Sequence, residues 1–166
     1  NKQEIAPLSA LVQPHIALIT DVSEAHLASF NNVGEIAKEK SDICFGLDKQ
    51  GHCVVSRDSH EYSRLFKYIN NFGVKIISFG ESKSSMYRVS KTVIKNNNTC
   101  AKAVLQSGVE FFFKVNSPGA HHAKNALGII CILEALEIDV TQGIFGLSNW
   151  FPASGRGLVT NIQCNR

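Results

Sequence analysis

One stretch of the sequence, residues 16–47, does most to restrict the fold. It opens with an apolar run at His15–Thr20, which has the length and composition of a buried parallel strand. After a polar loop, an amphipathic segment begins behind Asn31 and Asn32, which can act as helix N-caps, and Gly46 can end it as a C-terminal cap. Its apolar residues recur at helical spacing: Val33, Ile36, Ala37, Ile43, Cys44 and Leu47. The stretch therefore predicts a strand followed by a helix that packs against it.

One residue interrupts the apolar face of this predicted helix. The gap falls on Lys40, whereas Lys38, Glu39 and Asp42 lie on other faces, where we expect solvent to reach them. A lysine that faces a core must extend its amine to the surface, find a partner or lose its charge. Two interpretations stay open: a lysine that reaches solvent, and a lysine kept neutral enough to take part in chemistry.

The alternation of strand and helix continues along the chain. Strands are predicted at His52–Ser56 and Val74–Phe79, with a helix between them that Asp58 or Ser59 can cap and Gly73 can end. The core face of that helix is expected to hold Tyr62, Leu65, Phe66 and Ile69. The order strand, helix, strand, helix, strand predicts a parallel sheet with right-handed crossovers.

The pattern then changes to strands with short links. Tyr87–Ile94, Thr99–Gln106 and Val109–Val115 are predicted strands, joined by turns at Asn96–Asn98 and Ser107-Gly108. They predict a small, separate antiparallel sheet beside the parallel one.

Three further helices complete the expected fold. Glu4–Val12 has helical spacing that Pro7 interrupts, Ser117–Gly119 opens a long helix, and Asp139 caps a last helix at Val140–Leu147. The long helix is expected to turn these residues to the core: Ala126, Leu127, Ile130, Leu133, Ala135 and Leu136. We therefore predict an α/β domain over residues 1–166: a Rossmann-like, mainly parallel sheet flanked by helices, plus a small antiparallel three-stranded sheet.

Composition narrows the functional classes. A formal charge of +3 gives no indication of nucleic-acid binding, and no apolar run approaches the roughly 20 residues that a membrane span needs. Five scattered cysteines without a C-x-x-C pair favour reduced thiols. The 166 residues contain no G-x-x-x-x-G-K-[ST] phosphate loop.

The residues around Lys40 resemble a known family. ALITDVSEAHLASF, followed by IAKEKSDICFGL, is similar to the central domain of the Mur ligases. The resemblance implies that His26 is a Mg²⁺ ligand and that Lys40 is the lysine that this family carbamylates. Asp21 stands where the family usually has Asn, and Asp42 where it usually has Glu.

Two later stretches extend the resemblance. GAHHAKNALG resembles the family motif whose two asparagines recognise the ATP adenine: Asn125 matches the second, His122 replaces the first, and His121 matches the preceding histidine. A histidine offers one hydrogen bond where an amide offers both a donor and an acceptor. FPASGRG resembles a later stretch and implies that Arg156 reaches the nucleotide phosphate.

The resemblance implies an ATP-dependent ligase that uses Mg²⁺ and adds D-Ala-D-Ala to a UDP-N-acetylmuramoyl peptide through an acyl phosphate. We expect a cytoplasmic monomer without membrane insertion or nucleic-acid partner. The chain is expected to be a fragment, inactive alone, with the phosphate loop and the C-terminal domain outside residues 1–166. Three alternatives stay open: another Mur-type amino-acid ligase, a non-catalytic nucleotide-binding module, and a structural domain without a ligand.

Overall fold

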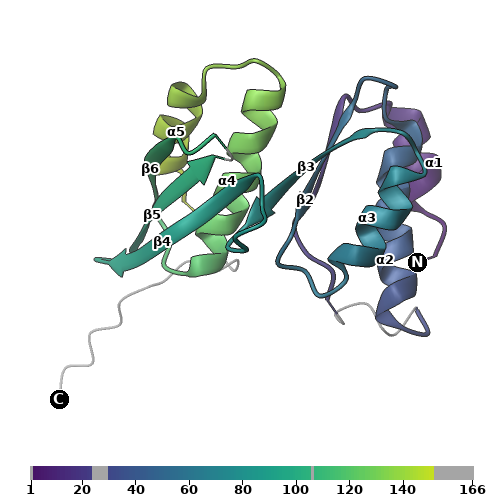
Figure 1. Cartoon of the computed structure of the whole chain (residues 1–166), viewed down its shortest axis with the longest axis horizontal. Coiled ribbons are helices and arrows are strands. Elements are labelled where there is room, and N and C mark those ends of the chain that lie inside the picture. The colour runs from purple at the N-terminus through teal and green to yellow at the C-terminus, as the bar shows by residue number, and fades with distance from the viewer. Residues whose placement is uncertain (1, 24–29, 106, 152–166) are drawn as a thin grey trace.

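The computed structural model describes residues 2–23, 30–105 and 107–151 (Figure 1). Helices and strands alternate in its first half, whereas three consecutive strands and two helices form its second half. In chain order the elements are α1 (Ile5–Val12), β1 (Ile16–Ile19), α2 (Val33–Ser41), the 3₁₀ helix η2 (Asp42–Gly46), β2 (His52–Ser56), α3 (Tyr62–Asn70), β3 (Lys75–Gly80), β4 (Tyr87–Lys95), β5 (Asn98–Leu105), β6 (Glu110–Val115), α4 (Ala120–Ala135) and α5 (Val140–Asn149). The predicted α/β class is confirmed.

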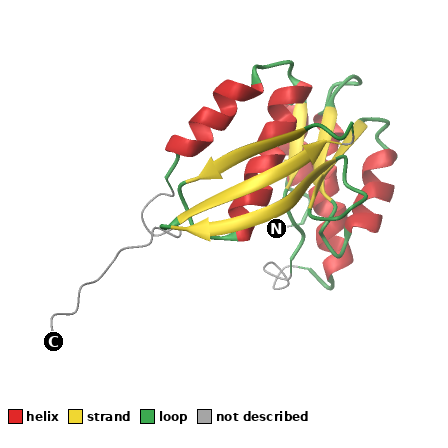
Figure 2. Cartoon of the chain, turned by 60° about the vertical axis from the view of Figure 1, so that its left-hand side comes forward, coloured by secondary structure: helices red, strands yellow, loops and turns green. Residues whose placement is uncertain are grey.

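The six strands form one mixed sheet in the order β1-β2-β3-β4-β5-β6. Strands β1, β2 and β3 are parallel, and β4, β5 and β6 are antiparallel, as predicted (Figure 2). The prediction that the antiparallel strands form a separate sheet is wrong. Strand β4 joins β3 through a short parallel pairing of Phe79 with Tyr87 and of Gly80 with Arg88.

The short connection between β3 and β4 explains this continuity. The Ser78 hydroxyl accepts a hydrogen bond from the backbone N–H of Met86 at 3.1 Å. The Asp58 carboxylate accepts from the backbone N–H groups of Glu81 and Ser82 at 2.8 and 3.0 Å. These bonds hold the connection against the ends of β2 and β3, so the first residues of β4 pair with the free edge of β3.

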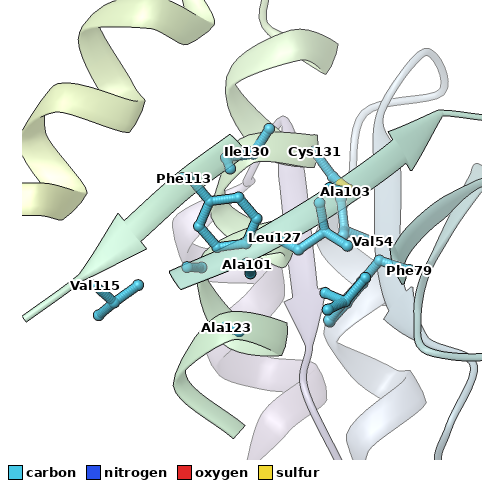
Figure 3. Packing of buried hydrophobic residues seen from close by; sticks show 12 residues of the cluster. Val54, Phe79, Ala101, Ala103, Phe113, Val115, Ala123, Leu127, Ile130 and Cys131 are labelled. Atoms are coloured by element: carbon cyan, nitrogen blue, oxygen red, sulfur yellow. The ribbon is translucent and has the colours of Figure 1, made fainter. Parts of the chain in front are cut away.

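Two buried clusters cover the two faces of the sheet. Helices α2 and α3 pack on one face of the parallel half, and α1 lies against η2 beside them (Figure 1). On the other face α4 contacts all six strands. Figure 3 shows Leu127 and Ile130 of α4 among Val54, Phe79 and Phe113 of the strands. A single helix thus joins the parallel and antiparallel halves into one core.

Several local predictions are confirmed. Strand β2 has the predicted bounds. The Asn32 side chain accepts from the N–H of Glu35, and the Asp139 side chain accepts from the N–H of Thr141, so both residues are N-caps. Helix α3 ends at Asn70 with Asn71 as its C-cap, and the predicted stop, Gly73, lies in the following turn with a φ of 70°.

Other helix predictions need correction. Pro7 does not interrupt α1, because it lies in the first turn, where its missing N–H is not needed. Helix α2 ends at Ser41 and continues as η2, so Gly46 is not its left-handed cap. A Cβ at Gly46 would lie 2.0 Å from the Ser9 carbonyl oxygen, so glycine is needed there because α1 passes so close.

Two predicted core residues lie largely at the surface. Phe66 is 45% exposed, because Leu65 and Ile69 fill the buried side of α3 with Tyr62 packed beside them, and Phe66 lies against the ring of Tyr62 from outside. Leu136 is also 45% exposed, because α4 ends at Ala135 and the chain turns away from the sheet there.

The described cysteines carry free thiols. Cys44, Cys53 and Cys131 are buried in the core, and Cys100 is exposed on β5. Cys164 lies outside the described residues. Among the residues that the structure describes, no helix is long and apolar enough to cross a membrane.

Candidate functional site

Lys40 lies at the carboxyl end of β1. Helix α2 directs its half-buried side chain to the backbone that follows the strand, where Nζ donates a hydrogen bond to the Asp21 carbonyl at 2.6 Å. The gap in the apolar face therefore marks a lysine that has found a polar partner at the edge of the sheet. Ligands of open α/β sheets bind outside the carboxyl ends of the strands, so Lys40 stands at the expected edge.

The prediction that Glu39, the residue before Lys40, faces solvent is wrong. Glu39 was expected in solvent, yet it is only 8% exposed. Its carboxylate accepts hydrogen bonds from three backbone N–H groups at the start of α1: those of Gln3, Glu4 and Ile5, at 2.8, 3.0 and 3.1 Å. A helix start has free N–H groups and a positive dipole end, and both favour a carboxylate. Glu39 thus holds α1 against the helix that carries Lys40.

Asp42 is also withdrawn from solvent. It is half-buried, and burial raises its pKa above the usual carboxyl value, with the neighbouring Glu39 adding to the shift. Of the three charged residues expected on solvent-facing sides of this segment, only Lys38 is exposed.

Asp58 connects three elements at the carboxyl ends of the parallel strands. It follows β2, and either Asp58 or Ser59 was expected to cap α3. The N-cap is instead Glu61, which makes no side-chain cap, although the Ser59 hydroxyl accepts from the Glu61 N–H at 3.3 Å. Asp58 instead accepts from the β3–β4 connection, as described above, and lies 3.5 Å from the Nζ of Lys124 on α4. This ion pair brings the first turns of α4 to the carboxyl ends of the parallel strands.

A buried threonine holds the start of α4. Thr99 of β5 is fully buried, donates to the Ser117 carbonyl at 2.6 Å and accepts from the Gly119 N–H at 2.9 Å. At Gly119, φ is 141°, and a Cβ there would lie 2.6 Å from the His121 ring. Glycine therefore lets the chain enter α4 with the His121 ring folded back over the helix start.

The three described residues of the predicted adenine site lie together on α4. The rings of His121 and His122 are 4.0 Å apart, and Asn125 follows one turn later. Burial, and then the charge of His121, lower the pKa of His122 below its usual value, which favours a neutral imidazole. Asn125 is exposed, and its amide can offer both a donor and an acceptor to a ligand.

His122 and Asn125 border a groove of about 440 Å³ between α4 and α5. Its other residues are mostly apolar, among them Ala126, Ile129 and Trp150. An apolar groove with a few polar groups at one end is typical of sites for small organic ligands.

Two predicted site residues cannot be placed. His26 and Arg156 lie outside the described residues. Within the described ranges, no group of three or more His, Cys, Asp or Glu side chains is arranged to hold a metal ion. Lys40 and the α4 residues therefore carry the described part of the site. Sequence reasoning missed Glu39, Asp58 and Thr99, and only the carboxylate of Asp58, directly after a predicted strand, could have indicated such a role.

Comparison with known proteins gives a consistent picture. The family model described as the Mur ligase middle domain matches residues 1–133. The UDP-N-acetylmuramoyl-tripeptide--D-alanyl-D-alanine ligase of Rickettsia prowazekii is 28% identical over 167 residues, covering 98% of this chain and 36% of that protein. The UDP-N-acetylmuramate--L-alanine ligase of Clostridium tetani is 27% identical over 139 residues, covering 82% of this chain and 29% of that protein. The chain thus spans about a third of the length of the curated relatives it matches.

Solved structures share the fold. A crystal structure of MurF from Acinetobacter baumannii superposes with a TM-score of 0.84 at 22% identity, covering 93% of this chain and 33% of that one. MurF ligase from Thermotoga maritima in complex with ADP gives a TM-score of 0.79 at 20% identity, covering 93% and 35%.

Proposed function

Because the chain belongs to the Mur ligase family, through its middle domain, we propose that it forms the nucleotide-binding unit of a ligase that adds D-Ala-D-Ala to a UDP-N-acetylmuramoyl tripeptide. The whole protein would be about three times as long as this chain, and residues 1–166 would be its middle domain. The observation that carries the proposal is Lys40, which lies at the carboxyl end of β1 within the family match.

The α4 residues would bind the adenine. The Asn125 amide can pair with one ring nitrogen and the amino group of the base, because it offers an acceptor and a donor side by side. A neutral His122 adds one further hydrogen bond. Arg156 would pair with the nucleotide phosphate through its guanidinium group.

Lys40 and His26 would hold Mg²⁺. A carbamate on Lys40 replaces an ammonium donor by two carboxylate oxygens, which are the ligands that Mg²⁺ prefers. The carbamate nitrogen keeps one N–H, so the hydrogen bond to the Asp21 carbonyl can survive the modification. A carbamylated Lys40 would therefore match the oxygen donors that Mg²⁺ prefers. The ion would neutralise charge on phosphoryl oxygens.

The proposed chemistry has two steps. The carboxylate of the muramoyl peptide attacks the γ-phosphorus of ATP, which forms an acyl phosphate and releases ADP. The amine of D-Ala-D-Ala then attacks the acyl carbon, and inorganic phosphate leaves. Both steps gather negative charge on phosphoryl oxygens, so the contribution of this chain is to orient the nucleotide and supply cationic and dipolar groups.

A ligase that adds a single amino acid is the second candidate, because a curated relative of that kind is 27% identical. The two candidate functions are distinguished by giving the complete ligase each UDP-linked muramoyl substrate in combination with each amine, and by measuring the release of phosphate. Release that requires UDP-N-acetylmuramoyl tripeptide and D-Ala-D-Ala supports the first candidate, and release with UDP-N-acetylmuramate and L-Ala supports the second.

Lys40 provides the sharper test. In the complete ligase, Lys40→Ala should abolish most turnover, and acetate should restore part of it by supplying a carboxylate in the vacated position. Lys38→Ala is the matched control, since Lys38 is an exposed lysine on the same helix. Wild-type turnover by Lys40→Ala at low CO₂ and saturating substrates would show that Lys40 has no catalytic role.

We also propose that the ligase acts in the cytoplasm, where ATP and UDP-linked precursors are available, and that it is a monomer. Sedimentation of the complete protein at several concentrations tests the second point.

A further inference from the structure

Trp150 lies directly after α5 and faces the groove beside α4. Its backbone N–H donates to the Leu147 carbonyl, which fixes the residue to the last turn of the helix. Its side chain is 45% exposed, and its ring centroid lies 6.0 Å from that of His122, with the planes tilted by 53°. A large aromatic surface therefore remains open beside the polar end of the groove.

The groove has the form that a flat heterocycle requires. Ala126 and Ile129 supply apolar surface along α4. On the α5 side, a Cβ built at Gly146 would meet no atom of the described residues within 4 Å. Among the described residues, Asn125 and His122 can form hydrogen bonds at its polar end. This arrangement offers stacking and apolar contact to the ring and hydrogen bonds to one edge of it.

We propose that Trp150 is a base-binding residue, and that its indole stacks on the purine ring whose polar edge Asn125 recognises. This inference rests on the proposed function, because it assigns a further residue to the same nucleotide site. The base lies on the open face of the indole. It does not insert between Trp150 and His122, because two stacking contacts would need about 7 Å and the ring centroids are only 6.0 Å apart.

The chain provides a direct readout, because Trp150 is its only tryptophan. Titration of the protein with AMP should quench the indole fluorescence in a saturable way. Ribose 5-phosphate carries the same sugar and phosphate without a base, so it should bind more weakly and leave the fluorescence unchanged. Equal affinity for both ligands would overturn the inference.

Three variants separate stacking from simple packing, with AMP affinity measured by calorimetry. Trp150→Leu keeps apolar bulk but removes the aromatic face, and should weaken AMP binding by between about 5-fold and 100-fold. Trp150→Phe keeps a stacking ring and should stay within about 3-fold of the wild type. Phe145→Ala removes an exposed aromatic ring that lines a different groove on α5, and should not change the affinity.

The outcomes distinguish this inference from the proposed function. If the wild type binds AMP and Trp150→Leu binds it equally well, the stacking role is wrong and the nucleotide site stands. If the wild type shows no saturable binding at millimolar AMP, the proposed nucleotide site in this chain is itself wrong, and the inference fails with it.

Discussion

Removal of the buried carboxylate of Glu39 should destabilise the domain strongly. In Glu39→Ala, three backbone N–H groups at the start of α1 lose their acceptor. Hydrogen bonds to a charged group contribute about 1.5–3 kcal/mol each when buried. Gln3 and Glu4 are exposed, so water can replace part of their bonds, and we take the lower end of the range or less. The expected loss is about 3–4 kcal/mol, a large part of the roughly 5–15 kcal/mol that stabilises a typical domain.

Glu39→Gln is the matched variant. One oxygen of Glu39 accepts from Glu4 and Ile5, and the other accepts from Gln3. Glutamine keeps one acceptor oxygen, but its NH₂ group would face the N–H of Gln3, so we expect a loss of about 1–2 kcal/mol. Urea unfolding followed by far-ultraviolet circular dichroism measures both losses, provided that the m-value stays constant.

Local detachment of α1 would appear as a different result. Amide exchange of α1 then rises sharply while the remaining core stays protected, and the loss of global stability is smaller. If Glu39→Ala loses less than about 1 kcal/mol and the amides of α1 remain protected, the three hydrogen bonds do not anchor this helix and the reasoning is refuted.

Two further predictions concern activity and pH. The isolated 166-residue chain should release no ADP from ATP in the presence of Mg²⁺, because it contains no phosphate-loop motif, and a coupled ADP assay that detects Mg²⁺-dependent release would contradict this. Glu35 accepts hydrogen bonds from Lys2 and from the side chain and backbone of Asn31. These bonds, the one from Lys2 most of all, hold the pKa of Glu35 at about 2, below its ordinary value of 4.5. A carboxylate whose pKa is lowered by folding stabilises the folded state at pH values above its ordinary pKa. This contribution is lost as the pH falls through the pKa that the group has in the folded state. The difference in urea midpoint between the wild type and Glu35→Gln should therefore be largest above pH 4.5 and disappear towards pH 2. A constant difference over this range would show that Lys2 and Asn31 do not stabilise the Glu35 carboxylate.

The sequence was most informative where one local rule decides the structure. The bounds of β2 follow from a continuous apolar run, and the caps at Asn32 and Asp139 need only a side-chain oxygen at a helix start. The class of the fold followed from the order of such elements. These features depend on contacts within a few residues, which a sequence displays directly.

The errors arose where partners are distant in the chain. Glu39 is acidic and lies beside a lysine, so its helix position alone predicts solvent, yet its partners are 34 to 36 residues away. Asp58 resembles a helix cap, but it binds backbone 23 and 24 residues later. For the same reason, the pairing of β3 with β4 could not be foreseen from two separate strand patterns. Within the site, Lys40 was found because a charge interrupted an apolar face, whereas the place of Trp150 beside His122 depends on how α5 packs.

The position of α4 in the chain has a consequence for biosynthesis. This helix contacts all six strands but follows every one of them, so the sheet face that it covers stays open on the growing polypeptide. Val54 is translated 73 residues before its partner Leu127, which corresponds to roughly 4–15 s at about 5–20 residues per second. During that interval the nascent chain exposes a broad apolar surface, with Phe79 and Phe113 added to it in turn. The apolar face that α4 covers can therefore be buried only after this helix has been made, and until then it favours aggregation.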